Sequence, residues 1–85
     1  MNKKELIQNE IDRVNQVNIP PSEEINAFLK TKGDTLLSTG VKLSELIKRP
    51  ELSYQELYFI DKDRPYLPDD VKDEVNIQIK RFVFL

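Results

Sequence analysis

Five prolines limit the length of any helix that this chain of 85 residues can form. A proline inside a helix removes a backbone hydrogen bond, clashes with the preceding turn and holds the residue before it in an extended conformation. Between the prolines, apolar residues recur at helical spacing. The sequence therefore predicts an all-α fold class, a small array of about five short amphipathic helices with proline-rich connections, interrupted at Pro20, Pro21, Pro50, Pro65 and Pro68.

Two helices are expected before the first glycine. Residues 3–16 alternate apolar and polar side chains with a helical period. Residues 22–32 start with Ser22 as an N-cap, carry two glutamates in the first turn, where the helix dipole favours acids, and stop before Gly33.

The middle of the chain is expected to form a loop and a third helix. The loop lies between the two glycines, with Leu36 and Leu37 as a buried pair. The third helix follows within residues 41–49, with Leu43, Leu46 and Ile47 on one face, and ends at the next proline.

The stretch RPELSYQEL joins this helix stop to a new helix start without a flexible spacer. Ser53 and Glu56 match a capping box, and Leu52 and Leu57 occupy the positions of a hydrophobic staple. The sequence predicts a fourth helix over residues 54–60, entering at a fixed angle.

The last segment has two possible conformations. Pro68 followed by two aspartates is typical of a helix start, and Val71, Val75, Ile79 and Phe82 recur at helical spacing. Residues 75–80 also alternate like a strand. We expect a helix, because the start signals are strong and no partner strand is evident.

Composition restricts the chemistry that the chain can perform. Cysteine and histidine are both absent, which excludes disulfides and thiolate metal sites and removes the usual general base. We expect no catalytic residue and no metal ligand, so that the chain by itself is not an enzyme. No apolar run resembling a signal peptide or a membrane anchor follows the first residues, and we expect a cytoplasmic protein with one helical domain over residues 1–85.

The net charge of −2 is unevenly distributed. Residues 30–49 hold five cations against two acids, a local charge of +3, whereas residues 51–76 hold eight acids against three cations, a local charge of −5. At most one face could contact a phosphate backbone. The candidate contacts are two basic pairs, which would otherwise serve as ordinary charges at helix C-termini: Lys48, Arg49, Lys80 and Arg81.

Other polar and aromatic clusters have simpler explanations. An EF-hand counted from Asp61 finds Tyr66 where glycine is needed and Lys72 where glutamate is needed, so a solvated linker and helix start is the better interpretation. The acids of residues 69–74 suit the first turns of a helix. A further group of aromatic residues could form a protein interface or part of the core: Tyr54, Tyr58, Phe59 and Tyr66.

Three segments together resemble a known family. PPSEEINAFL, STGVKLSELIKRPELSYQEL and LPDDVKDEVNIQIK are similar, in this order and spacing, to the start of the C-terminal helical region of the MnmG/GidA family, flavoproteins that modify the wobble uridine of tRNA. The resemblance covers residues 19–80. Its most specific parts are the motif of Leu46, Arg49, Pro50, Glu51, Tyr54 and Leu57 and the series Val71, Val75, Ile77, Ile79 and Lys80.

The resemblance implies a function for a longer parent protein. Such a parent would bind FAD, form a homodimer and act on tRNA together with the MnmE GTPase. The chain itself would be a non-catalytic helical module without a cofactor, supplying surface for tRNA or for the partner.

The end of the chain departs from the family. Where members continue with a sequence such as IKYEGYI, this chain reads IKRFVFL. We therefore expect an excised domain or a truncated copy. The alternative function is that of a stand-alone helical protein-interaction domain of the same ancestry.

Overall fold

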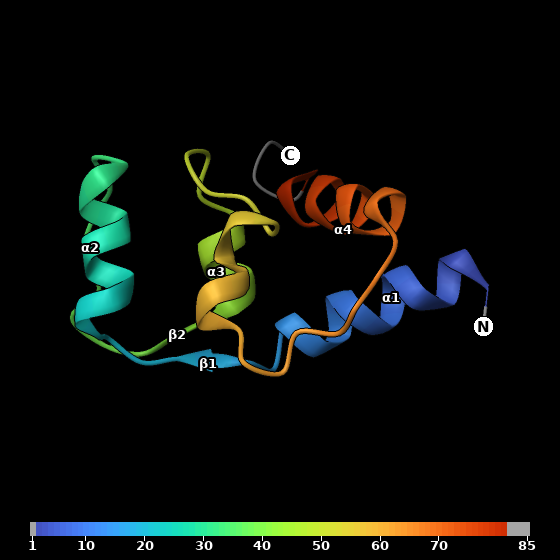
Figure 1. Ribbon diagram of the computed structural model, residues 1–85, viewed down its shortest axis with the longest axis horizontal. Coiled ribbons are helices and arrows are strands. Elements are labelled where there is room, and N and C mark those ends of the chain that lie inside the picture. The colour runs from blue at the N-terminus through green and yellow to red at the C-terminus, as the bar shows by residue number, and fades with distance from the viewer. Residues whose placement is uncertain (1, 82–85) are drawn as a thin grey trace.

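A computed structural model describes residues 2–81, and Figure 1 shows the arrangement of its elements. The helices are α1 (Lys3–Val14), α2 (Glu23–Thr31), α3 (Leu43–Ile47) and α4 (Asp69–Arg81), with a 3₁₀ helix η1 (Glu56–Ile60). Two short strands, β1 (Asn18–Ile19) and β2 (Val41–Lys42), complete the described elements.

The structure confirms a mostly helical domain, but the predicted all-α class omits a short pair of strands. β1 and β2 pair antiparallel, with Asn18 opposite Lys42 and Ile19 opposite Val41. The fourth expected helix is a 3₁₀ helix that begins two residues later than predicted.

The helices form two groups joined by the strands. At one end α1 and α4 pack against each other, and α3 and η1 lie in the middle (Figure 1). Helix α2 stands at the other end and is reached through β1 and β2 (Figure 1). We call residues 20–40 the α2 lobe and the remaining described residues the body.

One apolar core runs through the described residues, and every helix contributes to it. The three predicted apolar residues of α3 are fully buried. Leu37 is buried as expected, but Leu36 is 48% exposed, so the predicted buried pair is wrong for Leu36. The buried side chains are Ile7, Val14, Ile19, Ile25, Leu29, Leu37, Leu43, Leu46, Ile47, Leu52, Tyr54, Leu57, Leu67, Val71, Val75 and Ile79.

Helix α4 settles the choice between helix and strand at residues 75–80. Val75 and Ile79 are buried, whereas Ile77 between them is 48% exposed. This difference follows from a helical period, which places residues four apart on one face. Phe82, the last member of the predicted apolar series, and residues 83–85 lie outside the described residues.

The corner between α3 and η1 keeps half of the predicted capping box. The Glu56 amide donates to Ser53 Oγ at 3.1 Å, as expected. The Glu56 carboxylate accepts from the Ser53 hydroxyl at 3.1 Å and pairs with Lys32 of the α2 lobe. Leu52 and Leu57, the predicted staple, are both buried. The glutamate thus ties the corner to the lobe.

The α2 lobe is a unit with its own internal bonds. Ser22 caps α2 by accepting from the Ile25 amide at 3.3 Å, as predicted. Gly33 follows the helix with φ of +67°, a conformation that favours glycine. Asn26 then binds the returning chain, accepting from the Leu37 amide at 2.8 Å and donating to its carbonyl at 3.2 Å.

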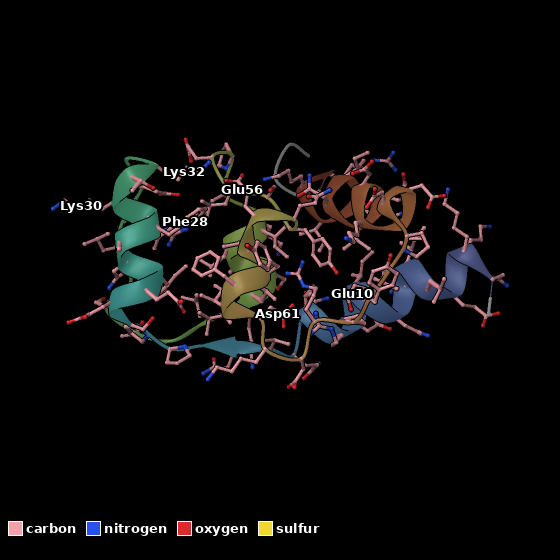
Figure 2. All side chains as sticks on the ribbon, viewed as in Figure 1. Glu10, Phe28, Lys30, Lys32, Glu56 and Asp61 are labelled. Atoms are coloured by element: carbon pink, nitrogen blue, oxygen red, sulfur yellow. The ribbon has the colours of Figure 1, made fainter. Side chains whose placement is uncertain are left out.

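Side-chain contacts dock this lobe onto the body. The Phe28 and Phe59 rings lie 5.1 Å apart at 60°. Lys32 pairs with Glu56, and Figure 2 shows Phe28, Lys32 and Glu56 along the side of α2 that faces the body.

A buried polar network joins α1 to the segment around η1. Arg13 donates to both oxygens of Glu10, at 2.7 and 2.8 Å, and to both oxygens of Asp61, at 2.9 and 2.5 Å. Arg64 donates to Asp61 at 2.6 Å and to the Tyr54 carbonyl at 2.8 Å. Tyr54 donates its hydroxyl to Glu10. Figure 2 shows Glu10 and Asp61 within the body.

The network balances its charges although its acids are almost inaccessible. Glu10 and Asp61 are each 3% exposed. Burial alone would raise the pKa of Asp61, but the hydrogen bonds from Arg13 and Arg64 outweigh it and lower the pKa. Burial and the hydrogen bond to Glu10 raise the pKa of Tyr54, which therefore stays a neutral donor.

We expect replacement of Asp61 by asparagine to destabilise the fold by about 2–3 kcal/mol, because it removes a charged acceptor shared by two arginines. Asp63→Asn is the matched control, since Asp63 is exposed in the same loop and should change the free energy of unfolding by less than about 0.5 kcal/mol. Urea unfolding followed by circular dichroism measures both. Equal effects of the two variants would contradict the role given to Asp61.

Acid should weaken the fold through the same carboxylate. The pKa of Asp61 is lower in the folded state, so its contribution is present above the unfolded pKa of about 3.9 and is lost as the pH falls through the folded pKa. We expect the urea midpoint to change little between about pH 7 and 5 and to fall below about pH 4. The fall should be shallower in Asp61→Asn than in the unchanged chain, and parallel curves would argue against this assignment.

Candidate functional site

The four predicted phosphate contacts are brought close together where α3 and α4 end. Lys80, in the last turn of α4, donates from Nζ to the Ile47 carbonyl and to the Arg49 carbonyl, both at 2.8 Å. These two bonds bring residues 47–49 next to residues 80–81. The basic pairs, separated by more than thirty residues in the sequence, therefore form one cluster, which we call the helix-end cluster: Lys48, Arg49, Lys80 and Arg81.

Lys80 acts within this cluster as a cap on another helix. The last carbonyls of a helix lack intrahelical donors, and a cation satisfies them favourably. Its ammonium is half-buried, and burial lowers the pKa of Lys80, an effect that Glu51 and Glu56 partly oppose. This charge is thus directed inward, onto α3.

Arg49 is also engaged inside the molecule. It donates to the Thr35 carbonyl at 2.7 Å and lies 3.4 Å from the Asp34 carboxylate, both in the α2 lobe. Arg49 therefore docks the lobe in addition to any contact with a partner.

The remaining two members of the helix-end cluster are more accessible. Lys48 pairs with Glu45 at 3.2 Å one turn earlier, a half-exposed pair that water and salt can exchange. Arg81 is exposed and makes no ion pair with any residue in the described range 2–81. Lys48 and Arg81 are the members whose charge can reach a ligand.

The cations without a partner in the described range, Arg81 included, are scattered over the surface. Among the residues that the structure describes, those without an ion pair or hydrogen bond from the side chain lie on five different elements or connections: Lys4, Lys30, Lys42, Lys62 and Arg81. Lys30 lies on α2, on the side of that helix away from the body (Figure 2).

The aromatic group predicted as interface or core divides between these roles. Tyr54 is fully buried, and the guanidinium of Arg64 lies 3.7 Å from the centre of its ring. Phe59 packs partly buried against Phe28. Tyr58 and Tyr66 are 67% and 96% exposed, so they remain available to a partner.

The acidic linker differs from its predicted character. Asp61 was expected in a solvated linker, yet it is buried and held by two arginines. No group of three or more metal-ligand side chains gathers anywhere in residues 2–81. Within the same range, no helix is long and apolar enough to span a bilayer.

The buried network was not predicted from the sequence, although a signal for it existed. Glu10 lies three residues after Ile7 and four before Val14, on the apolar face of α1. An acid at such a position needs a buried partner, and Arg13 follows one turn later. The partner Asp61 is 48 residues away from Arg13 in the sequence, so no local pattern could reveal it.

Comparisons with known proteins give a consistent result. Residues 1–80 match the family described as "tRNA modifying enzyme MnmG/GidA C-terminal helical domain". Over 80 residues, the chain is 54% identical to the tRNA uridine 5-carboxymethylaminomethyl modification enzyme MnmG of Caldicellulosiruptor saccharolyticus. It is 48% identical to the same enzyme of Clostridium botulinum strain Loch Maree and 39% identical to that of Finegoldia magna. Each match covers 94% of this chain but only 13% of the relative.

The capping role of Lys80 can be tested against its neighbour. Lys80→Met removes both bonds to the carbonyls of residues 47 and 49 and should destabilise the fold by about 1–2 kcal/mol. Arg81→Met, one residue on and exposed, should have an effect of less than about 0.5 kcal/mol. Thermal unfolding of both variants measures these effects. An unchanged midpoint for Lys80→Met would mean that the cap contributes nothing to the stability of the fold.

Proposed function

Since the chain belongs to the MnmG/GidA family, as the C-terminal helical domain of such tRNA-modifying enzymes, we propose that it is a non-catalytic module that contributes surface for tRNA or for an MnmE-like GTPase. The observation that carries the proposal is the convergence of the two basic pairs at the helix-end cluster. At this cluster, two segments that are distant in the sequence bring their cations to one place.

The members of the helix-end cluster have different tasks in this proposal. Lys80 and Arg49 hold the ends of α3, α4 and the lobe together, and their residual charge adds to the local field. Lys48 and Arg81 contact phosphates directly, because exposed cations can exchange a water or a weak surface pair for a phosphate oxygen.

The proposal assigns the chemistry to other parts of a parent protein. The chain spans 13% of the length of the curated relatives that it matches, so a cytoplasmic, homodimeric parent that binds FAD is part of the proposal. FAD does not fit the residues present here. The two glycines are Gly33, after α2, and Gly40, before β2, and the strands in the described range are antiparallel, unlike a dinucleotide-binding unit. Residues 1–85 would be one domain of the parent.

A second candidate function is a helical protein-interaction domain that works independently of tRNA. The exposed rings of Tyr58 and Tyr66 favour it, because tyrosine is enriched at protein interfaces. The two functions differ in their dependence on salt, since phosphate contacts release counterions and aromatic contacts do not.

Titration of the chain with tRNA at two salt concentrations tests the proposal. We expect a dissociation constant of roughly 10⁻⁴–10⁻⁶ M at physiological ionic strength, tightening steeply as the salt concentration is lowered. Lys48→Gln combined with Arg81→Gln should reduce the slope of log K against log salt by about 1–2, because each lost phosphate contact removes roughly 0.7–0.9.

Lys4→Gln is the matched control, since Lys4 is an exposed cation on α1, whose N-terminal end lies far from the end of α3 (Figure 1). It should leave the slope within about 0.3 of the unchanged chain. Absence of binding at low salt while circular dichroism shows an intact fold would exclude a direct tRNA role for this domain. An equal loss in Lys4→Gln would exclude the helix-end cluster as the contact.

A further inference from the structure

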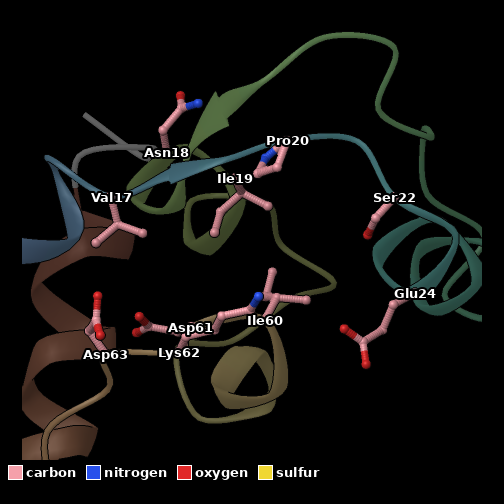
Figure 3. Close-up of a pocket in the computed structure, with 10 residues that line it drawn as sticks. All are labelled: Val17, Asn18, Ile19, Pro20, Ser22, Glu24, Ile60, Asp61, Lys62 and Asp63. Carbon is pink, nitrogen blue, oxygen red and sulfur yellow. The ribbon is translucent and has the colours of Figure 1, made fainter.

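A groove of about 440 Å³ lies on the side of the molecule where the α2 lobe meets the body (Figure 3). One wall is the chain from Val17 through β1 to Pro20 and on to the start of α2, and the other is the loop at residues 60–63. The side chains of Val17, Ile19 and Ile60 point into the space between the walls (Figure 3). The middle of the groove is therefore apolar.

The two ends of the groove carry acids without partners. Glu24 lies at the end formed by α2, and Asp63 lies at the other end (Figure 3). Both are exposed, and neither pairs with any cation in the described range 2–81. Asp61 also lines the groove, but its charge is already balanced by Arg13 and Arg64. Lys62 is the cation of the lining. It offsets one of the two unpaired acids, so the groove keeps a net negative charge.

We propose that this groove is a docking site for an extended peptide segment with one aliphatic side chain flanked on both sides by basic residues. The aliphatic side chain would replace water over the half-buried Val17 and Ile60, and the flanking cations would lie near Glu24 and Asp63. This inference goes beyond the tRNA surface proposed above, because it concerns a separate face and a protein ligand.

Charge selects a peptide over a nucleic acid as the occupant. A phosphate backbone would place its negative charges beside two uncompensated carboxylates, which repel it, and Lys62 is the one cation among the residues that line the groove. A cationic peptide is attracted to the same carboxylates and gains from burial of its apolar residue.

The shape of the groove selects an extended segment over a helix. A helix with its side chains is about 10–12 Å across, whereas a groove of about 440 Å³ accommodates only one or two side chains beside a single strand of backbone. Such an occupant contacts both β1 and the loop at residues 60–63. It would thereby bridge the base of the α2 lobe and the body.

Nuclear magnetic resonance of the ¹⁵N-labelled chain tests the proposal with a synthetic probe. The probe is acetyl-Lys-Thr-Ile-Thr-Lys-amide, and the control peptide is acetyl-Glu-Thr-Ile-Thr-Glu-amide. We expect shifts of the Ile19, Ile60 and Asp63 amides with a dissociation constant of about 1 mM for the basic probe, and at least about threefold weaker binding of the acidic peptide.

Matched substitutions separate the groove from general charge effects. Glu24→Lys combined with Asp63→Lys should weaken the basic probe about tenfold. Glu23→Lys, in the same exposed first turn of α2 but outside the groove lining, should change the affinity less than about twofold.

Several outcomes would overturn the proposal. These are an absence of shifts at about 5 mM probe, shifts that map outside the groove, equal binding of the two peptides, or equal losses for Glu23→Lys and the double variant. A short single-stranded oligonucleotide that shifts the Ile19 and Ile60 amides more strongly than the basic probe would assign the groove to nucleic acid instead. The spectrum of each variant without peptide shows whether it is folded, so a loss of binding can be attributed to the groove.

Discussion

One carboxylate shared by two arginines determines how the body of this domain can be assembled. Asp61 accepts from Arg13 of α1 and from Arg64 of the loop before α4, and it is almost completely removed from water. A charge buried in this way is tolerated only when its partners are in place. Because one partner is in the first helix and the other is three residues after the acid, the carboxylate cannot be fully satisfied until α1 has met the segment that follows η1. In a domain with so small a core, this requirement restricts which arrangements of the helices are acceptable.

Local signals predicted the helices wherever the residues that start, stop and bury a helix all lie within one segment. The serine cap and glycine stop of α2, the apolar face of α3 and the proline start of α4 are written within a few residues of one another. Residues 75–80 became a helix for the same reason, since their alternation had no strand to pair with nearby. The β1–β2 pair was missed because two residues give no periodicity. The fourth helix was predicted, but its 3₁₀ form and its start at Glu56 were not.

The candidate site, in contrast to the helices, depends on contacts between segments that are distant in the sequence. Sequence patterns identified the two basic pairs but not the direction of each side chain, since Lys80 turns toward the carbonyls of α3 and Arg49 toward the lobe. Charge counted along the sequence therefore overstates the charge that a ligand meets. The groove beside β1 could not be predicted at all, because its walls come from two distant segments, residues 17–24 and 60–63, and its acids look like ordinary surface charges.

The pairing of β1 with β2 has a topological consequence. Residues 20–40 leave the body and return to it at neighbouring points, fixed by the Asn18–Lys42 and Ile19–Val41 pairs. The connectivity of the body therefore does not depend on how many residues lie between β1 and β2. Closing a longer excursion costs little, about 0.6 kcal/mol for each doubling of its length. An engineer could lengthen this excursion while the first and last helices continue to meet as they do here, provided that Asp34 and Thr35 still reach Arg49.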